Sequence, residues 1–114
     1  MSYWVSLLDE NGKTVEVDKH CEGGTYAVGG TNEAELNVTY NYGKYTWKYL
    51  EEGLRSLHGK KAKEFITIFE KAVKELGTKQ DNDYWKPTKG NVGYMFNILL
   101  NWSKQYPEAI FNIN

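Results

Sequence analysis

The hydrophobic pattern changes period once along the chain, and this change predicts the fold class. In residues 13–18 and 34–42 apolar residues alternate with polar ones, whereas from residue 43 they recur at helical spacing, about every 3.6 residues. Alternation is typical of a half-buried strand, and helical spacing is typical of an amphipathic helix. We therefore expect an α+β protein with a small antiparallel sheet packed against three amphipathic helices. Its 114 residues fit one domain spanning 1–114.

The predicted sheet begins with a hairpin. Residues 3–8 have the aromatic and β-branched content of a strand, and Asn11-Gly12 is a strong hairpin signal because both turn positions tolerate positive φ. Residues 13–18 form the expected return strand. A short strand over 25–28 follows, between two glycine pairs that are read as β-turns because the phosphate-binding glycine motifs are not matched.

The alternating run over 34–42 predicts a further strand with two different faces. Leu36, Val38 and Tyr40 are expected to face the core, while Asn37, Thr39 and Asn41 share the opposite face. The tail over 109–114 is expected to add a last strand at a sheet edge.

Three apolar stripes predict the helices. The first stripe, Trp47-Leu50-Leu54-Leu57, covers a helix over about 43–57, and the second covers a helix that ends before Gly77. The third helix is expected to begin after Thr88 as its N-cap and to end at Pro107.

Charge and cysteine content argue against several functions. The chain has 14 basic and 15 acidic residues, and Arg55 is its only arginine, so the basic stripe of a duplex nucleic-acid binder is missing. Cys21 is the only cysteine, which excludes an internal disulfide. We see no signal peptide and no apolar run of the roughly 20 residues that span a bilayer. These features predict a cytoplasmic protein that does not bind membranes.

Metal binding and cysteine catalysis are not expected. His20 and Cys21 are adjacent, so on a strand their side chains point to opposite faces, and His58 is far away in the sequence. We predict no metal, no cofactor and no catalytic residue. Asp81 and Asp83 could supply a carboxylate pair for acid–base chemistry, but Asp residues more often form turns.

The strongest candidate for a site combines the polar strand face with a later loop. Asn37, Thr39 and Asn41 would donate and accept hydrogen bonds, while aromatic rings would stack on a planar ligand. Arg55 or the helix start after Thr88 would meet negative charge, unless Arg55 simply pairs with a neighbouring glutamate. The candidate ligand-binding set is Asn37, Thr39, Asn41, Tyr42, Arg55, Asp83, Tyr84, Trp85, Thr88 and Asn91. The alternative is a solvent-exposed sheet face whose polar residues only maintain solubility.

Three segments carry a family resemblance: 37–42 (Asn-Val-Thr-Tyr-Asn-Tyr), 53–59 (Gly-Leu-Arg-Ser-Leu-His-Gly) and 83–91 (Asp-Tyr-Trp-Lys-Pro-Thr-Lys-Gly-Asn). Together they resemble a family of short uncharacterised proteins from bacteria and bacteriophages. The resemblance covers nearly the whole chain. It implies a bacterial or phage cytosolic setting, but no activity and no site residues.

These observations favour a non-enzymatic accessory protein that binds a polar or anionic, nucleotide-like small molecule, in order to sequester a signal. The alternative is an inhibitor or adaptor that contacts a host protein, such as a defence protein, through exposed tyrosine and tryptophan. A pocket binder should have convergent, concave aromatic residues, whereas a protein binder should expose them as a flat patch. A homodimer is also conceivable, because an open sheet edge invites pairing.

Overall fold

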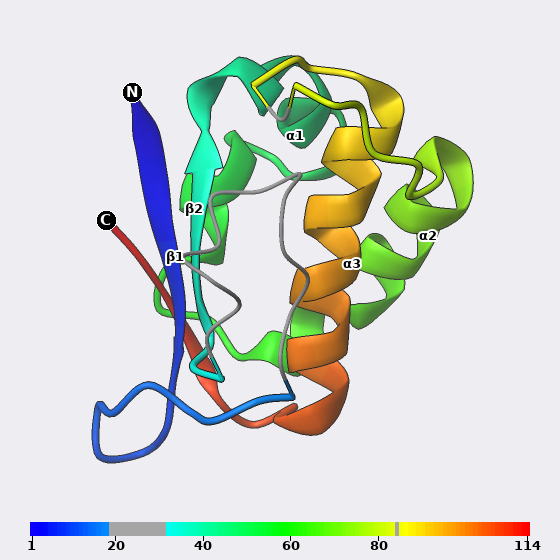
Figure 1. Cartoon of the computed structure of the whole chain (residues 1–114). Helices are drawn as coiled ribbons and strands as arrows, with labels where there is room; N and C mark the ends of the chain where they lie inside the picture. Colours follow the sequence, from blue (N-terminus) through cyan, green and yellow to red (C-terminus); the bar gives the residue numbers. More distant parts are fainter. Residues whose placement is uncertain (19–31, 84) are drawn as a thin grey trace.

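A computed structural model describes residues 1–18, 32–83 and 85–114, and it confirms the α+β class (Figure 1). A three-stranded antiparallel sheet packs against the helices on one of its faces. In chain order the elements are β1 (Ser2–Leu8), β2 (Glu35–Thr39), η1 (Tyr40–Tyr42), α1 (Gly43–Tyr49), η2 (Gly53–Leu57), η3 (Ala62–Phe65), α2 (Ile66–Leu76), α3 (Lys89–Gln105) and β3 (Ile110–Ile113), where η marks a 3-10 helix.

β1 is the central strand of the sheet, in the order β2-β1-β3. Val5 pairs with Leu36 on one side and with Ile113 on the other, so alternate residues of all three strands face the same way. This face carries the buried side chains of Val5, Leu7, Leu36, Val38, Phe111 and Ile113. Burying one such side chain stabilises the fold by roughly 1.5–3 kcal/mol. The strand predicted over the C-terminal tail is confirmed, since β3 pairs with β1.

One edge of the sheet is closed by a neighbouring segment. Gly59 donates its N–H to the carbonyl of Phe111 (2.8 Å), and Phe111 donates to the carbonyl of Lys60 (3.0 Å). Residues 59–61 therefore cover the outer edge of β3. An open edge there cannot be the basis for the predicted homodimer, which stays a prediction.

The predicted hairpin turn forms, but the return strand differs from the prediction. Asp9 Oδ1 accepts the N–H groups of Asn11 (2.8 Å) and Lys13 (3.0 Å), and Gly12 has φ 78°. After the turn, the chain makes one isolated bridge to β1 and then pairs with the residues before β2, where Ala34 donates to the carbonyl of Val15 (3.0 Å). The alternating pattern still buries its apolar side chains, since alternation determines the face of a strand and not its pairing partner.

The predicted first helix is broken into two shorter pieces. α1 ends at Tyr49, and the chain reverses through Glu52 and Gly53, which have φ 64° and 67°. η2 follows, so the helical stripe expected over 43–57 does not continue. Trp47 was expected in the core but is 62% exposed, and its indole lies over Gly53 instead. The leucines of the stripe are buried as predicted.

α2 ends and α3 begins where predicted, and the two helices pack against each other, although the stripe that starts at Ala62 first forms the 3-10 helix η3. Gly77 has φ 73° directly after α2, and the Thr88 hydroxyl accepts the Asn91 N–H (3.1 Å) at the start of α3. The ring of Phe69 lies between those of Phe96 (5.8 Å) and Phe111 (6.1 Å), which joins α2, α3 and β3 in one aromatic core. No helix in the described parts of the chain is both long and apolar enough to cross a membrane.

Two glycines allow the chain to run directly against the first turns of α3. A Cβ on Gly93 would overlap the carbonyl oxygen of Gly77, and one on Gly90 would overlap the carbonyl of Lys79. These neighbouring atoms belong to the backbone and cannot turn aside. Residues 77–79 can therefore leave α2 along this path only while both positions lack a side chain.

Several sequence predictions fall on residues that the structure does not describe. His20, Cys21 and the two glycine pairs, with the short strand expected over 25–28 between them, lie outside the described residues. Tyr84, a member of the candidate site, also lies outside them.

The close approach at Gly93 leads to a stability prediction. We expect Gly93→Ala to lower the free energy of unfolding by about 3 kcal/mol, because overpacking displaces backbone. Gly43→Ala is the matched control: its Cβ would lie 4.0 Å from Trp47 Cδ1, and its φ is helical. That change should be neutral or stabilise by up to about 1 kcal/mol. Urea denaturation followed by circular dichroism measures both, and equal stability of the two variants would contradict the close approach.

Candidate functional site

The polar residues predicted on one strand face are not arranged as an open row. Asn37 and Thr39 are only 6% and 2% exposed. The Asn37 side-chain amide donates to Ser2 Oγ (2.8 Å), and Thr39 Oγ1 accepts the Asn41 N–H (3.2 Å). β2 ends at Thr39, so Asn41 belongs to η1, and its predicted place on this face is wrong. Tyr40 was expected in the core and is 39% exposed, because it too lies beyond the end of the strand.

The structure does bring the two halves of the predicted site together, at Asn41 and Trp85. The Asn41 side-chain amide donates a hydrogen bond to the Trp85 carbonyl (3.0 Å), across 44 positions of sequence. Both residues are exposed. Tyr42, predicted to stack on a ligand, is fully buried in the core instead. The contact therefore joins two exposed residues, through the side chain of Asn41 and the backbone of Trp85.

Asn91 holds the loop that carries Trp85. Its side chain is 0% exposed, and its Oδ1 accepts the Asp81 N–H (2.8 Å). Its Nδ2 donates to the carbonyls of Asp83 (3.1 Å) and Lys86 (2.9 Å). Both amide hydrogens are thus used within the protein. In this arrangement Asn91 shapes the loop and presents no surface to a ligand.

The carboxylates of Asp81 and Asp83 form two successive turns. Asp81 Oδ1 accepts the Asp83 N–H (2.9 Å), and Asp83 Oδ1 accepts the Trp85 N–H (3.1 Å). Aspartates commonly bond the backbone two residues ahead in this way. This geometry supports the turn interpretation over a carboxylate pair that acts on a substrate. Within residues 1–18, 32–83 and 85–114, no group of three or more His, Cys, Asp and Glu side chains is placed to hold a metal ion.

Arg55 lies over an aromatic pair. Its guanidinium carbon is 5.4 Å from the centre of the Tyr3 ring, and the Tyr3 ring is 4.4 Å from that of Tyr40. A cation over a ring contributes about 0.5–1 kcal/mol at an exposed position. Tyr40 directly precedes Asn41 in the chain, so the aromatic pair is covalently next to the residue that bonds Trp85.

We name the surface formed by Tyr3, Tyr40, Asn41, Arg55 and Trp85 the aromatic rim. The start of β1, the end of β2 and the loop over 81–88 lie at the same end of the molecule (Figure 1). Of the residues predicted for the site, the rim contains three. The sequence analysis did not include Tyr3 and Tyr40 in the site. The strand pattern assigned Tyr40 to the core, and Tyr3 lay in a predicted strand without a site role.

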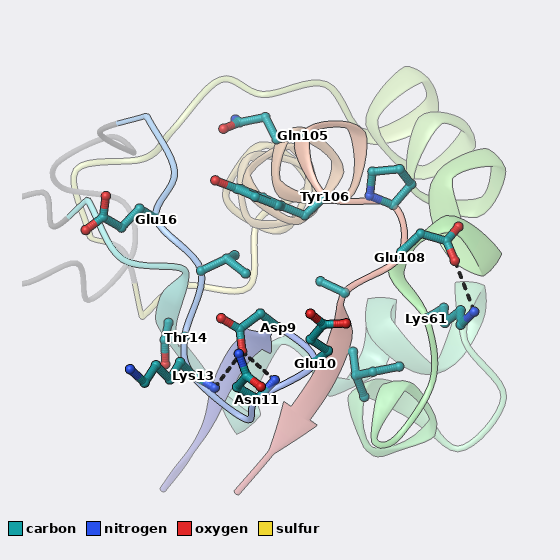
Figure 2. Close-up of a pocket in the computed structure, with 14 residues that line it drawn as sticks. Asp9, Glu10, Asn11, Lys13, Thr14, Glu16, Lys61, Gln105, Tyr106 and Glu108 are labelled. Carbon is teal, nitrogen blue, oxygen red and sulfur yellow. Dashed lines mark hydrogen bonds and ion pairs between the residues drawn. The ribbon is translucent and has the colours of Figure 1, made fainter.

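A groove of about 960 Å³ lies at the opposite end of the molecule, and the sequence did not predict it. It runs between the turn after β1 and the segment that joins α3 to β3 (Figure 2). Its lining consists of Asp9, Glu10, Asn11, Lys13, Thr14, Val15, Glu16, Lys61, Gln105, Tyr106, Pro107, Glu108, Ala109 and Ile110. These residues come from separate parts of the chain and form no local motif, so no sequence signal marks them.

The hydroxyl of Tyr49 makes a contact between helices, and its pKa is raised. Its hydroxyl donates to Glu75 Oε1 (2.8 Å), which connects α1 to α2. Burial, followed by the hydrogen bond and the negative charge of Glu75, raises the pKa of Tyr49 to about 12. The hydroxyl therefore stays protonated at neutral pH, so this contact has a structural role.

The chain matches no family model, no curated protein and no solved structure in these comparisons. The family resemblance of its three motifs stays a prediction. The function is therefore inferred from the geometry of its own residues.

The Asn91 contacts lead to a prediction about the loop. Asn91→Asp keeps the shape of the side chain but places carboxylate oxygens against two carbonyls, so we expect a loss of about 3 kcal/mol in the free energy of unfolding. Asn101→Asp, at an exposed position of the same helix, should change it by less than about 0.5 kcal/mol. Urea denaturation measures both, and a similar small effect of the two changes would show that the amide does not hold the loop.

The Tyr49 contact leads to a prediction about alkaline pH. Because the fold raises the pKa of Tyr49 from its ordinary value of 10.0 to about 12, the stabilisation is complete below pH 10 and is lost as the pH rises toward 12. We expect the stability difference between the wild type and Tyr49→Phe to shrink over this range. Glu75→Gln should lower the pKa of Tyr49 in a spectrophotometric titration, although not to 10.0, since burial is the larger cause. An unchanged titration in Glu75→Gln would contradict the assignment.

Proposed function

We propose that this chain is a non-enzymatic binding module that contacts a partner protein through the aromatic rim. The observation that carries the proposal is the exposure of three anchor-type side chains on the rim, where Arg55 and Tyr40 both contact Tyr3 and the Trp85 backbone is bonded to Asn41. Trp85 is 45% exposed and Tyr40 39%, and Arg55 is exposed as well. Tryptophan, tyrosine and arginine are the residues that dominate binding energy at protein interfaces.

The rim is supported in a way that favours binding. The Trp85 N–H is bonded to Asp83 Oδ1 (3.1 Å), its carbonyl is bonded to Asn41 (3.0 Å), and Asn91 holds the loop from inside. Backbone groups that are already hydrogen-bonded within the protein lose less conformational entropy when a partner binds. These contacts place the Trp85 side chain on a supported backbone.

Burial favours a protein partner over a small ligand. Asn37, Thr39, Tyr42 and Asn91 were predicted to contact a ligand, but all four are buried. Of the predicted residues, Asn41, Arg55, Asp83 and Trp85 remain exposed, and the rim adds the exposed Tyr40. A small polar molecule needs convergent polar groups in a concave site, whereas exposed tryptophan, tyrosine and arginine suit a protein partner. The proposal places the protein in the bacterial cytoplasm, or in the host cell if a phage encodes it, as an inhibitor or adaptor.

A second candidate function is kept because of one observation, the contact between Asn41 and Trp85. A planar polar molecule could stack on the Trp85 indole and hydrogen-bond to Asn41, with Arg55 or the start of α3 near Thr88 meeting a negative group. This would be a nucleotide-like ligand sequestered by the protein.

Site-specific crosslinking tests the proposal. Benzoylphenylalanine in place of Tyr40 should crosslink a discrete protein in bacterial cells, and the yield should fall at least about fivefold when Trp85→Ala is added. The same photoreactive residue in place of Lys71, which is exposed on α2, is the control and should not crosslink that protein.

The outcomes separate the two candidates. The same crosslinked proteins from both positions, or no loss with Trp85→Ala, would contradict the protein-partner proposal. Native mass spectrometry of the purified protein tests the second candidate. A co-purifying small molecule that is released by denaturation and absent from Asn41→Ala would favour ligand binding instead.

A further inference from the structure

The groove between the turn after β1 and the end of α3 has the construction of a binding site. Its aliphatic lining residues are Val15, Ala109 and Ile110, which we call the apolar floor, and Tyr106 and Pro107 also line it. Tyr106 is 37% exposed, and in Figure 2 it lies across the groove from Asp9 and Glu10. An apolar floor with polar groups around it is the usual composition of a ligand-binding cleft.

The charges around the groove select its occupant. Four carboxylates line it against two lysines. Lys61 is already paired with Glu108 (3.0 Å), which also pairs with Lys63 (2.8 Å). These two contacts lower the pKa of Glu108, so the carboxyl stays ionised.

The other lining lysine, Lys13, is outnumbered by carboxylates. Glu10 and Glu16 are exposed at the groove, and Asp9 also lines it. The C-terminal end of α3 reaches the groove at Gln105, where a helix of 17 residues carries partial negative charge. The electrostatic potential of the groove therefore favours a cationic occupant.

The shape of the groove favours a peptide over a small cation. Its volume of about 960 Å³ is near the upper limit of roughly 300–1,000 Å³ for small-molecule pockets. Its lining residues extend from Glu16 on one side to Glu108 on the other in Figure 2. An extended chain advances about 3.3 Å per residue, so several residues can lie along it.

We propose that this groove binds a basic, extended segment of a partner protein. Lysine or arginine side chains of the segment lie near Glu10 and Glu16, and an apolar residue between them packs on Tyr106 and the apolar floor. The site is independent of the aromatic rim, because it lies at the other end of the molecule and shares no residue with it.

Fluorescence anisotropy with a defined probe tests the groove. The probe is the labelled peptide Gly-Lys-Leu-Lys-Pro-Lys-Leu-Gly, and its counterpart with glutamate for each lysine is the charge control. We expect the lysine peptide to bind the full chain and the glutamate peptide not to bind. The double change Glu10→Gln with Glu16→Gln should weaken binding by about tenfold, and Tyr106→Ala should weaken it about fivefold.

Matched controls separate a specific groove from general attraction. Glu35→Gln with Glu51→Gln removes the same charge from exposed positions outside the groove and should change affinity less than about twofold. Trp85→Ala in the rim should also leave it unchanged, so this test succeeds or fails independently of the proposed function. Circular dichroism confirms that each variant is folded.

Three results would overturn the proposal. The first is an equal loss of affinity in the two double variants, and the second is no binding of the lysine peptide at about 1 mM. The third is self-association of the chain in sedimentation that disappears with Glu10→Gln and Glu16→Gln, since the groove would then bind a second copy.

Discussion

The side-chain amide of Asn91 is fully buried at the first turn of α3, and the loop over 81–86 is built around it. A buried amide without partners would destabilise the fold by about 1–3 kcal/mol, so the loop and the amide require each other. The same turn of α3 also requires Gly90 and Gly93, because residues 77–79 run against its backbone. The position of Trp85, and with it the aromatic rim, depends on this one region.

β1 and α3 connect the two surfaces of the molecule. Both run from the end that carries the aromatic rim to the end that carries the groove (Figure 1). β1 begins near Tyr3 in the rim and leads into the turn that lines the groove. α3 begins after the loop that carries Trp85 and ends at Gln105 in the groove. Because these elements belong to the packed core, they hold the rim and the groove at a defined separation. Substitutions in one surface can therefore be made without altering the residues of the other.

Local signals predicted the elements well and the site poorly. Thr88 and Gly77 act within one helical turn, so their capping roles could be predicted from the sequence alone. Asn37 and Asn91 have the same polar side chain that a ligand site would use, yet both are buried in contacts with distant residues. Polarity shows that an amide needs a hydrogen-bond partner, but not whether that partner is a ligand or the protein itself.

The sequence by itself determined the fold class, the end of α2, the start of α3 and the burial of the apolar faces of β2, α2 and α3. Hydrophobic periodicity acts through neighbouring residues, and each strand or helix must bury its own apolar side. The tertiary structure alone decided the pairing of residues 13–17, the break before η2, the contact between Asn41 and Trp85, and the groove. Each of these joins residues that are distant in sequence or depends on backbone conformations that many residues can adopt. Only the packed chain selects among such arrangements, because their free energies depend on contacts that no local segment contains.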